Sequence, residues 1–160
     1  MSSEILLATD GSPSAADATL EALELAKALD ATLIAVSVEH VTVPAYGYYG
    51  YAEIHEDLLA AEKAHVLGVL AETARLAEDA GVECETVARS GSVGGEICRL
   101  ARERDVRMIV IGAHGWGAFH RLVFGSVSTG VMHDAPCPVL VVPGTPIAPP
   151  EHVRADATAV

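Results

Sequence analysis

The sequence predicts an α/β fold in which an open, doubly wound parallel sheet of five strands carries helices on both faces. Short apolar runs alternate along the chain with longer amphipathic stretches, the order expected of βαβ crossovers. The runs at residues 5–9 and 108–111 are almost wholly apolar, as strands covered on both faces should be. The 160 residues are 51% hydrophobic, which suits one domain with a substantial core.

The first strand is predicted at residues 5–9. Either Ser12 or Ser14 can cap the helix that follows, which has a proline in its first turn. A second apolar strand is predicted at residues 33–38. Residues 43–51 contain a proline, two glycines and four tyrosines without periodicity, and therefore predict a loop or a lid.

A long helix is predicted at residues 54–80, and Gly81 ends it. Its expected apolar face consists of Leu67, Leu70, Ala74 and Ala77. In the third strand, at residues 82–88, Glu83 and Glu85 alternate with less polar residues. Such alternation is typical of a strand with one wet face or of a strand at the edge of a sheet.

The second half of the domain repeats this alternation of strand and helix. The remaining predicted elements are a helix at 94–104, a strand at 108–111, a glycine-rich loop, a helix at 126–133 and a strand at 139–142. Residues 144–160 hold three prolines and no periodic pattern, which predicts a flexible tail behind a domain at residues 1–143.

The net charge of −12 argues against nucleic acid as a partner, and it favours a divalent cation beside any bound ligand that carries several phosphates. The N-terminus has no basic region, and no run of about 18 apolar residues occurs, so we expect a cytoplasmic protein without membrane contact. Cys84, Cys98 and Cys137 form neither a paired set nor a C-x-x-C motif, which predicts buried free thiols.

A glycine-rich loop joins the strand at 108–111 to the helix that starts at Ser126. Ligands bind at such carboxyl ends of strands in open α/β sheets, and glycines let the backbone approach a phosphate. The amides at the helix start can hold an anion, and the hydroxyls of Ser126 and Ser128 add donors. His114, inside the loop, either donates to a phosphate or sits at the rim.

Asp10 follows the first strand, and it faces the glycine loop if the two strands are neighbours. A carboxylate there suits Mg²⁺ bridging to phosphates, or a ribose hydroxyl. The alternative is a structural role at the turn or at the start of the helix.

Several phosphate and hydrolase motifs are absent. No Gly-Lys-Ser/Thr occurs, G-x-G-x-x-G does not follow the first strand, and residues 126–130 do not form a G-x-S-x-G elbow. No residue is evidently placed as a general base, so we expect hydrolysis of a bound nucleotide to be slow at most and assign no catalytic residue.

Taken together, these motifs resemble the universal stress protein family over about residues 3–143. Its ATP-binding members carry G-x2-G-x9-G-[S/T], a spacing that Gly112, Gly115, Gly125 and Ser126 match in full. The opening Ala-Thr-Asp-Gly-Ser and the closing Ala-Pro-Cys-Pro-Val-Leu-Val-Val are also similar to the family. Trp116 and residues 118–120 are bulkier than is usual in that loop, which bears on the pose of the phosphates.

The resemblance implies a Rossmann-like sheet with the strand order 3-2-1-4-5, as in the adenine nucleotide α-hydrolase-like folds. It implies a stress-responsive, regulatory homodimer joined through residues 139–142, with ATP and Mg²⁺ or Mn²⁺ as ligands. AMP or cAMP, or a partner-binding dimer with an unused pocket, are the alternatives. The nucleotide-binding residues implied are Ala8, Thr9, Asp10, Val38, Gly112, Ala113, His114, Gly115, Gly125, Ser126, Val127 and Ser128.

Overall fold

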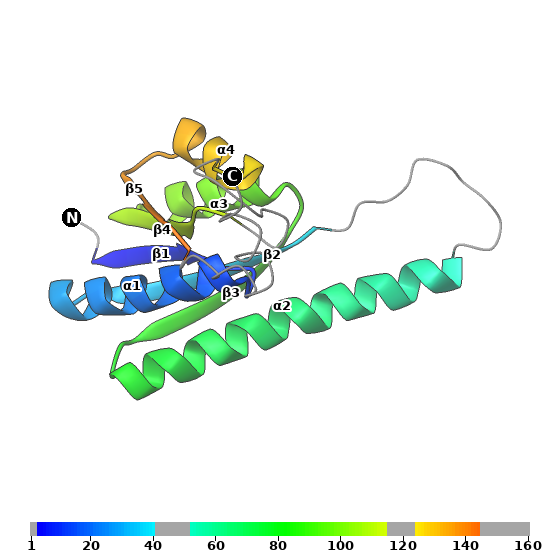
Figure 1. Cartoon of the computed structure of the whole chain (residues 1–160), viewed down its shortest axis with the longest axis horizontal. Helices are drawn as coiled ribbons and strands as arrows, with labels where there is room; N and C mark the ends of the chain where they lie inside the picture. The colour runs from blue at the N-terminus through cyan, green and yellow to red at the C-terminus, as the bar shows by residue number, and fades with distance from the viewer. Residues whose placement is uncertain (1–2, 41–51, 115–123, 145–160) are drawn as a thin grey trace, which may run out of the picture.

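The computed structural model describes residues 3–40, 52–114 and 124–144, with side chains from residue 56 onward in the second segment, and forms one sheet covered by helices (Figure 1). The described elements are β1 (Glu4–Ala8), α1 (Pro13–Leu29), β2 (Thr32–Glu39), α2 (Ala52–Ala80), β3 (Cys84–Ser90), α3 (Val93–Arg104), β4 (Met108–Gly112), α4 (Ser126–Asp134) and β5 (Val139–Val142). The predicted loop at 43–51 and all of the predicted tail except Gly144 lie outside the described residues.

The five strands are parallel and lie in the order β3-β2-β1-β4-β5, which confirms the predicted fold and strand order. β1 is central, and its last residue, Ala8, pairs with Val36 of β2 and Ile111 of β4. β3 is an edge strand with mostly exposed side chains, as its alternating glutamates predicted. The carboxyl ends of β1, β2 and β4 therefore meet at one edge of the sheet.

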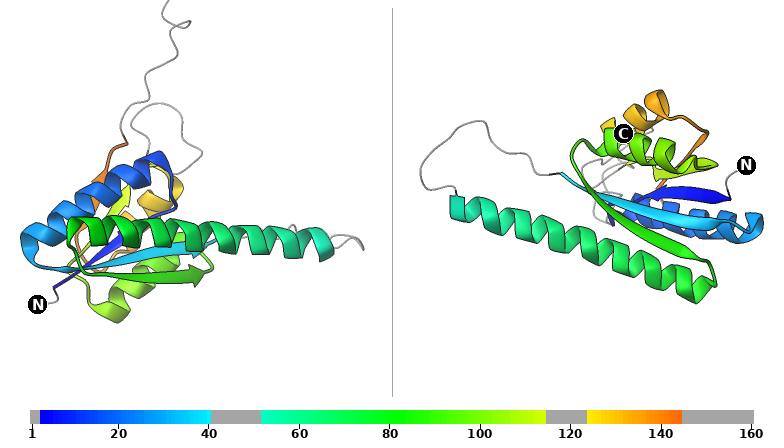
Figure 2. Two further views of the ribbon diagram at one scale, coloured as in Figure 1. Left: turned by 90° about the horizontal axis from the view of Figure 1, so that it is seen from below. Right: turned by 180° about the vertical axis from the view of Figure 1, so that it is seen from behind.

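The helices cover the two faces of the sheet in pairs, α1 with α2 and α3 with α4 (Figure 2). Alternate residues of each strand supply the two cores, as a period of two requires. Leu6 of β1 and Ile109 of β4 pack towards α3 and α4, whereas Leu7 and Val110 pack towards α1. All four of these side chains are fully buried.

The predicted apolar face of α2 is wrong by a small rotation. Leu67 is 51% exposed, and Val66 takes its place at 1% exposure beside the buried Leu70 and Ala77. Apolar residues occupy several adjacent positions on this helix, so two overlapping stripes fit the pattern, and packing on β2 and β3 selects one. No helix in the described segments has both the length and the hydropathy needed to cross a membrane.

The amino ends of the strands are held by helix ends on both faces. Asp30 closes α1 and Asp105 closes α3, each in the left-handed region with φ of 51° and 48°. Their amides bond back into the last helical turn. Arg104 then joins three elements, because its guanidinium donates to Glu4 of β1 at 2.7 Å and to Glu85 of β3 at 2.8 and 2.9 Å.

Candidate functional site

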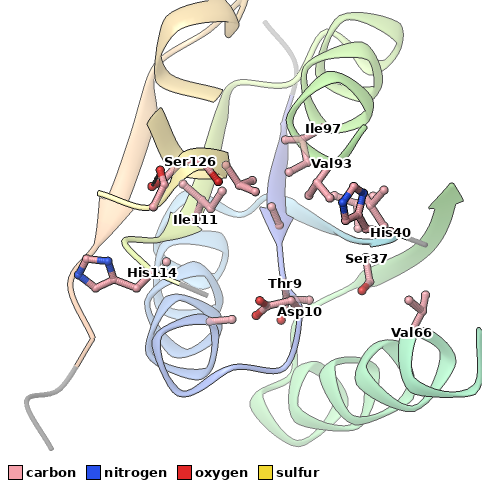
Figure 3. Close-up of a pocket in the computed structure, with 18 of the residues that line it drawn as sticks. Thr9, Asp10, Ser37, His40, Val66, Val93, Ile97, Ile111, His114 and Ser126 are labelled. Atoms are coloured by element: carbon pink, nitrogen blue, oxygen red, sulfur yellow. Dashed lines mark hydrogen bonds between the residues drawn. The ribbon is translucent and has the colours of Figure 1, made fainter. Parts of the chain in front are cut away.

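A cavity of about 510 Å³ opens at the carboxyl ends of β1, β2 and β4, between α2 and the start of α4 (Figure 3). Every sequence-predicted site residue that the structure describes lines it. These residues are Ala8, Thr9, Asp10, Val38, Gly112, Ala113, His114, Gly125, Ser126, Val127 and Ser128. Gly115 lies outside the described residues. The segments that follow the first strand and the fourth strand thus share one cleft.

The start of α4 presents amide groups to this cavity. Gly125 is the N-cap, and the first backbone bond of the helix runs from the Thr129 amide to the Gly125 carbonyl at 3.0 Å. The amides of residues 126–128 precede that bond, so helix geometry leaves them without intrahelical acceptors. Together with the helix dipole they form a site that favours an anion.

Ser126 and Ser128, which the sequence analysis treated alike as donors, differ in the structure. The Ser128 side chain is buried, and its hydroxyl lies 3.1 Å from the Ala113 carbonyl and 2.9 Å from the Gly125 carbonyl. The Gly125 amide also donates to Ala113 at 2.9 Å. Ser128 therefore braces the two ends of the glycine loop with its hydroxyl, and its amide is the group that it can offer to a ligand.

The two described glycines of the loop motif have different surroundings. A Cβ on Gly112 would lie 2.7 Å from Ser14 Oγ and 2.8 Å from the Ser14 carbonyl carbon and oxygen. A Cβ on Gly125 would meet its nearest protein atoms at 3.6–3.8 Å, which is ordinary contact. Packing of β4 against α1 thus explains the glycine at 112, whereas packing among the residues that the structure describes does not explain the glycine at 125.

The end of β1 brings a carboxylate to the cavity. Asp10 Oδ1 accepts a hydrogen bond from the Ser12 amide at 2.9 Å, which supports the start of α1, while Ser12 Oγ caps that helix through the Ala15 amide at 3.2 Å. Asp10 therefore has the predicted turn role and also lines the cavity. Among the described residues no group of three or more His, Cys, Asp or Glu side chains could hold a metal ion by itself.

The end of β2 offers backbone groups to the cavity. Thr9 donates from its amide to the Val36 carbonyl at 3.0 Å, and on the other side Gly91 donates to the Glu39 carbonyl at 3.2 Å. Even-numbered residues of β2 therefore point their N–H and C=O towards β1, and odd-numbered ones towards β3. Because β1 ends its pairing at Val36, the N–H and C=O of Val38 face the cavity.

His114 lies at the rim of the cavity. Its amide donates to Ser14 Oγ at 3.3 Å, which fixes the loop to α1. Figure 3 shows its ring directed away from Asp10. Its Nδ1 is buried and has no hydrogen-bond partner in the described part of the chain. Of the two sequence-based interpretations of this residue, the geometry favours the rim.

The sequence analysis missed the wall on the side of α2 and α3. Apolar side chains from α2 and α3 form this wall, and polar groups of β2, of α2 and of the chain after β2 border it. The missed residues include Ser37, His40, Glu62, His65, Val66, Val93 and Ile97. Glu62, His65 and Val66 follow a helical spacing of three and four, a signal that points to one face of α2 without showing what that face covers.

The cysteines do not line this cavity. All three are free thiols, as predicted, but only Cys98 is buried, whereas Cys84 and Cys137 are half-buried. Burial raises the pKa of each thiol above its ordinary value. Since the thiolate is the reactive form, these side chains are poor nucleophiles at neutral pH.

Comparisons with known proteins agree with this geometry. The model of the Universal stress protein family matches residues 1–143. A universal stress protein of Methanocaldococcus jannaschii is 33% identical over 143 residues, covering 87% of this chain and 81% of its own length. The structure of the universal stress protein UspA from Lactobacillus plantarum superposes with a TM-score of 0.77 at 28% identity, covering 87% of this chain and 96% of that one.

A second solved structure, a universal stress protein in complex with cAMP, superposes with a TM-score of 0.67 at 25% identity. It covers 89% of this chain and 97% of that one. The matched region contains the whole sheet, the cavity and the glycine motif that suggested the resemblance. The chain belongs to the universal stress protein family.

Proposed function

We propose that this protein binds ATP with Mg²⁺ or Mn²⁺ in the cavity and acts as a regulatory protein in a stress response. The observation that carries the proposal is the convergence on one cleft of the amides at the start of α4, the carboxylate of Asp10 and the exposed backbone of Val38. These groups match, in order, the phosphates, the ribose or metal, and the base of a nucleotide. A cavity of about 510 Å³ lies in the range of small-molecule sites.

The base end favours adenine. The N–H of Val38 can donate to N1 of adenine, and its C=O can accept from the exocyclic amino group. Guanine presents the reverse order, an oxygen acceptor beside an N–H donor, and would set two acceptors against each other. The apolar side chains of Val66, Val93 and Ile97 can make van der Waals contact with the adenine ring.

The residues present fit a divalent cation that is held mainly by the ligand. Magnesium in nucleotide sites keeps several waters and takes one or two carboxylates together with substrate phosphates. Asp10 can supply such a carboxylate, and the described residues provide no preformed cage. The cation would offset the repulsion between the triphosphate and a chain of net charge −12.

Native mass spectrometry of the purified protein, followed by calorimetric titration with ATP, tests the proposal. We expect a retained or titratable adenine nucleotide whose affinity for the protein falls when Mg²⁺ is removed. GTP should bind at least about fivefold more weakly than ATP, since a mispaired polar edge costs about 1–3 kcal/mol. Absence of binding to any adenine nucleotide would refute the proposal.

A second candidate ligand is cAMP or another adenine nucleotide without a triphosphate. The relative solved in complex with cAMP favours this alternative. A competition titration distinguishes the two: ATP should displace bound cAMP if ATP is the physiological ligand, and this displacement should depend on Mg²⁺. Failure of ATP to displace cAMP would favour the alternative.

We also propose that the protein is a homodimer joined through β5. Pro138, just before β5, and Val142, at its end, accept bonds from Ile109 and Ala113 on the β4 side. By alternation, Val139 and Val141 point their backbone groups outward. An open apolar edge of this kind invites pairing with a second copy.

The substitution Val141→Pro tests the dimer, because it removes an outward donor and leaves the bonds to β4 in place. It should give a monomer in light scattering. Val141→Thr keeps the amide and should remain dimeric. A wild-type monomer, or a dimeric Val141→Pro, would refute pairing through β5.

A further inference from the structure

One turn of α2 is tied to the ends of β1 and β2 by two hydrogen bonds. His65 Nε2 lies 3.0 Å from the carbonyl oxygen of Asp10, and the amide of His40 donates to Glu62 Oε1 at 3.4 Å. Glu62 and His65 are three residues apart and therefore lie on the same side of the helix. Both line the cavity, and we refer to the pair as the α2 latch.

The latch lies just beyond the point where hydrogen bonding between β1 and β2 ends. The ladder between β1 and β2 has its last pair at Ala8 and Val36 and closes with the Thr9 amide. Asp10 and His40 come after that point, so strand pairing does not fix the distance between their backbones. The latch fixes it, because both segments are bonded to neighbouring positions of one rigid helix.

The helix is itself anchored at this turn. Val66 is 1% exposed and packs with Leu70 against Ala35 of β2. One turn earlier the anchoring is lost, since Leu58 and Leu59 are 59% and 39% exposed. Residues 62–66 thus form the first turn of α2 that packs on the sheet, and the part of the helix that precedes them extends beyond the sheet (Figure 1).

We propose that the α2 latch positions the two strand ends for the nucleotide, holding Asp10 beside the ribose or metal and Val38 beside the base. The proposal rests on the function proposed above and assigns the latch a role that requires no contact with the ligand. Glu62 and His65 are positioning residues in this scheme. Without them, the strand ends would have to be ordered when the ligand binds, at the expense of affinity.

The chemistry of the latch makes a conservative replacement informative. The Asp10 carbonyl is an acceptor only, so His65 must carry a proton on Nε2. Glutamine can donate from an amide nitrogen at a similar reach, whereas leucine fills the same space without a donor. Lys63, two positions away, is exposed and does not line the cavity, and therefore provides a control on the same helix.

Calorimetric titration of the full chain with Mg²⁺–ATP and with AMP tests the latch. His65→Leu should weaken binding of both nucleotides about three- to tenfold, the range expected for one lost hydrogen bond. His65→Gln should recover to within about twofold of wild type, Glu62→Ala should behave like His65→Leu, and Lys63→Ala should bind as wild type does. Rescue by glutamine separates positioning from mere filling of space.

The outcomes are distinct. If wild type binds no adenine nucleotide, the proposed function fails and the latch falls with it. If wild type binds and His65→Leu binds equally well, the latch alone is refuted. Should His65→Leu fail to fold, ¹⁵N nuclear magnetic resonance of the wild-type protein at neutral pH can determine the tautomer of His65 instead. A proton on Nε2 supports the latch, and a neutral ring protonated only on Nδ1 overturns it.

Discussion

Replacing Gly112 with alanine should destabilise the fold, because this glycine lets β4 approach the first turn of α1. The new Cβ would lie 2.8 Å from the backbone carbon and oxygen of Ser14, and about 0.6 Å of movement is needed to reach the 3.4 Å of an ordinary contact. The obstacle is helix backbone, which cannot rotate away as a side chain would. Overpacking of this kind costs about 1–3 kcal/mol. For a domain of this size the Tm should fall by about 3–10 °C.

Gly125→Ala is the matched control within the same motif. The φ of −63° at this position suits alanine, and among the described residues the added methyl group meets its nearest atom at 3.6 Å. Loss of a glycine N-cap and the reduced entropy of the unfolded chain act in opposite directions and nearly offset. The Tm should stay within about 2 °C of wild type. ATP binding should nevertheless weaken, because the methyl group narrows the cavity at the start of α4.

Thermal unfolding followed by circular dichroism, with calorimetric titration of ATP on the same samples, checks both variants. We expect Gly112→Ala to lose stability and Gly125→Ala to lose affinity. The reasoning fails if Gly112→Ala unfolds at the wild-type Tm. It also fails if the two variants lose the same stability, since the contrast in their surroundings would then have no energetic meaning.

Three further substitutions test individual interactions. Ser128→Ala should lower the free energy of unfolding by about 1 kcal/mol in urea titrations, because the brace across the glycine loop is lost; an unchanged midpoint would contradict this. Arg104→Met should destabilise the fold modestly at neutral pH, because Arg104 holds the pKa of Glu85 below its ordinary value. The stabilisation from this ion pair is present when the pH is above the ordinary glutamate pKa, and it should vanish as the pH falls through the lowered pKa of Glu85. In Asp134→Asn the pKa of His133, which the Asp134 carboxylate raises, should fall in a proton-resonance titration. In the wild-type protein this pair adds a small stabilisation below the ordinary histidine pKa, which is lost as the pH rises through the raised pKa; in the variant this stabilisation should disappear.

The architecture of the sheet was predictable because its signals are local. Apolar runs without alternation marked the buried strands, and Glu83 and Glu85 marked the edge position of β3. The glycine loop and Asp10 could be placed in one cleft because the carboxyl ends of neighbouring parallel strands must meet. Each of these inferences needs only the order of elements along the chain.

The wall formed by α2 could not be predicted in the same way. The rotation of a long helix about its axis depends on the twisted surface beneath it, and the apolar pattern of α2 fits Leu67 as well as Val66. With the buried face placed on Leu67, the sequence analysis assigned no role to Glu62 or His65. An error of one residue in the buried face was enough to hide that wall of the cavity.

The roles of Gly112 and Ser128 could not be predicted for a related reason. A glycine in a phosphate-binding motif suggests a ligand, yet the atoms that exclude a Cβ at position 112 belong to Ser14, nearly 100 residues earlier in the chain. The hydroxyl of Ser128 likewise finds its acceptors within the loop. The contact of Gly112 with Ser14 leaves no local trace in the sequence, and the acceptors of the Ser128 hydroxyl depend on how the loop folds back on itself.

Several groups that hold this molecule together lie at the edge of the sheet opposite the cavity. Arg104 and the left-handed Asp30 and Asp105 lie at the amino edge, whereas the cavity opens at the carboxyl edge. Substitutions at the amino edge can therefore change the stability of the fold without altering the residues that line the cavity. The same separation is useful in protein engineering. Glycine at position 30 or 105 relieves the unfavourable φ and should raise the free energy of unfolding without changing the ligand preference.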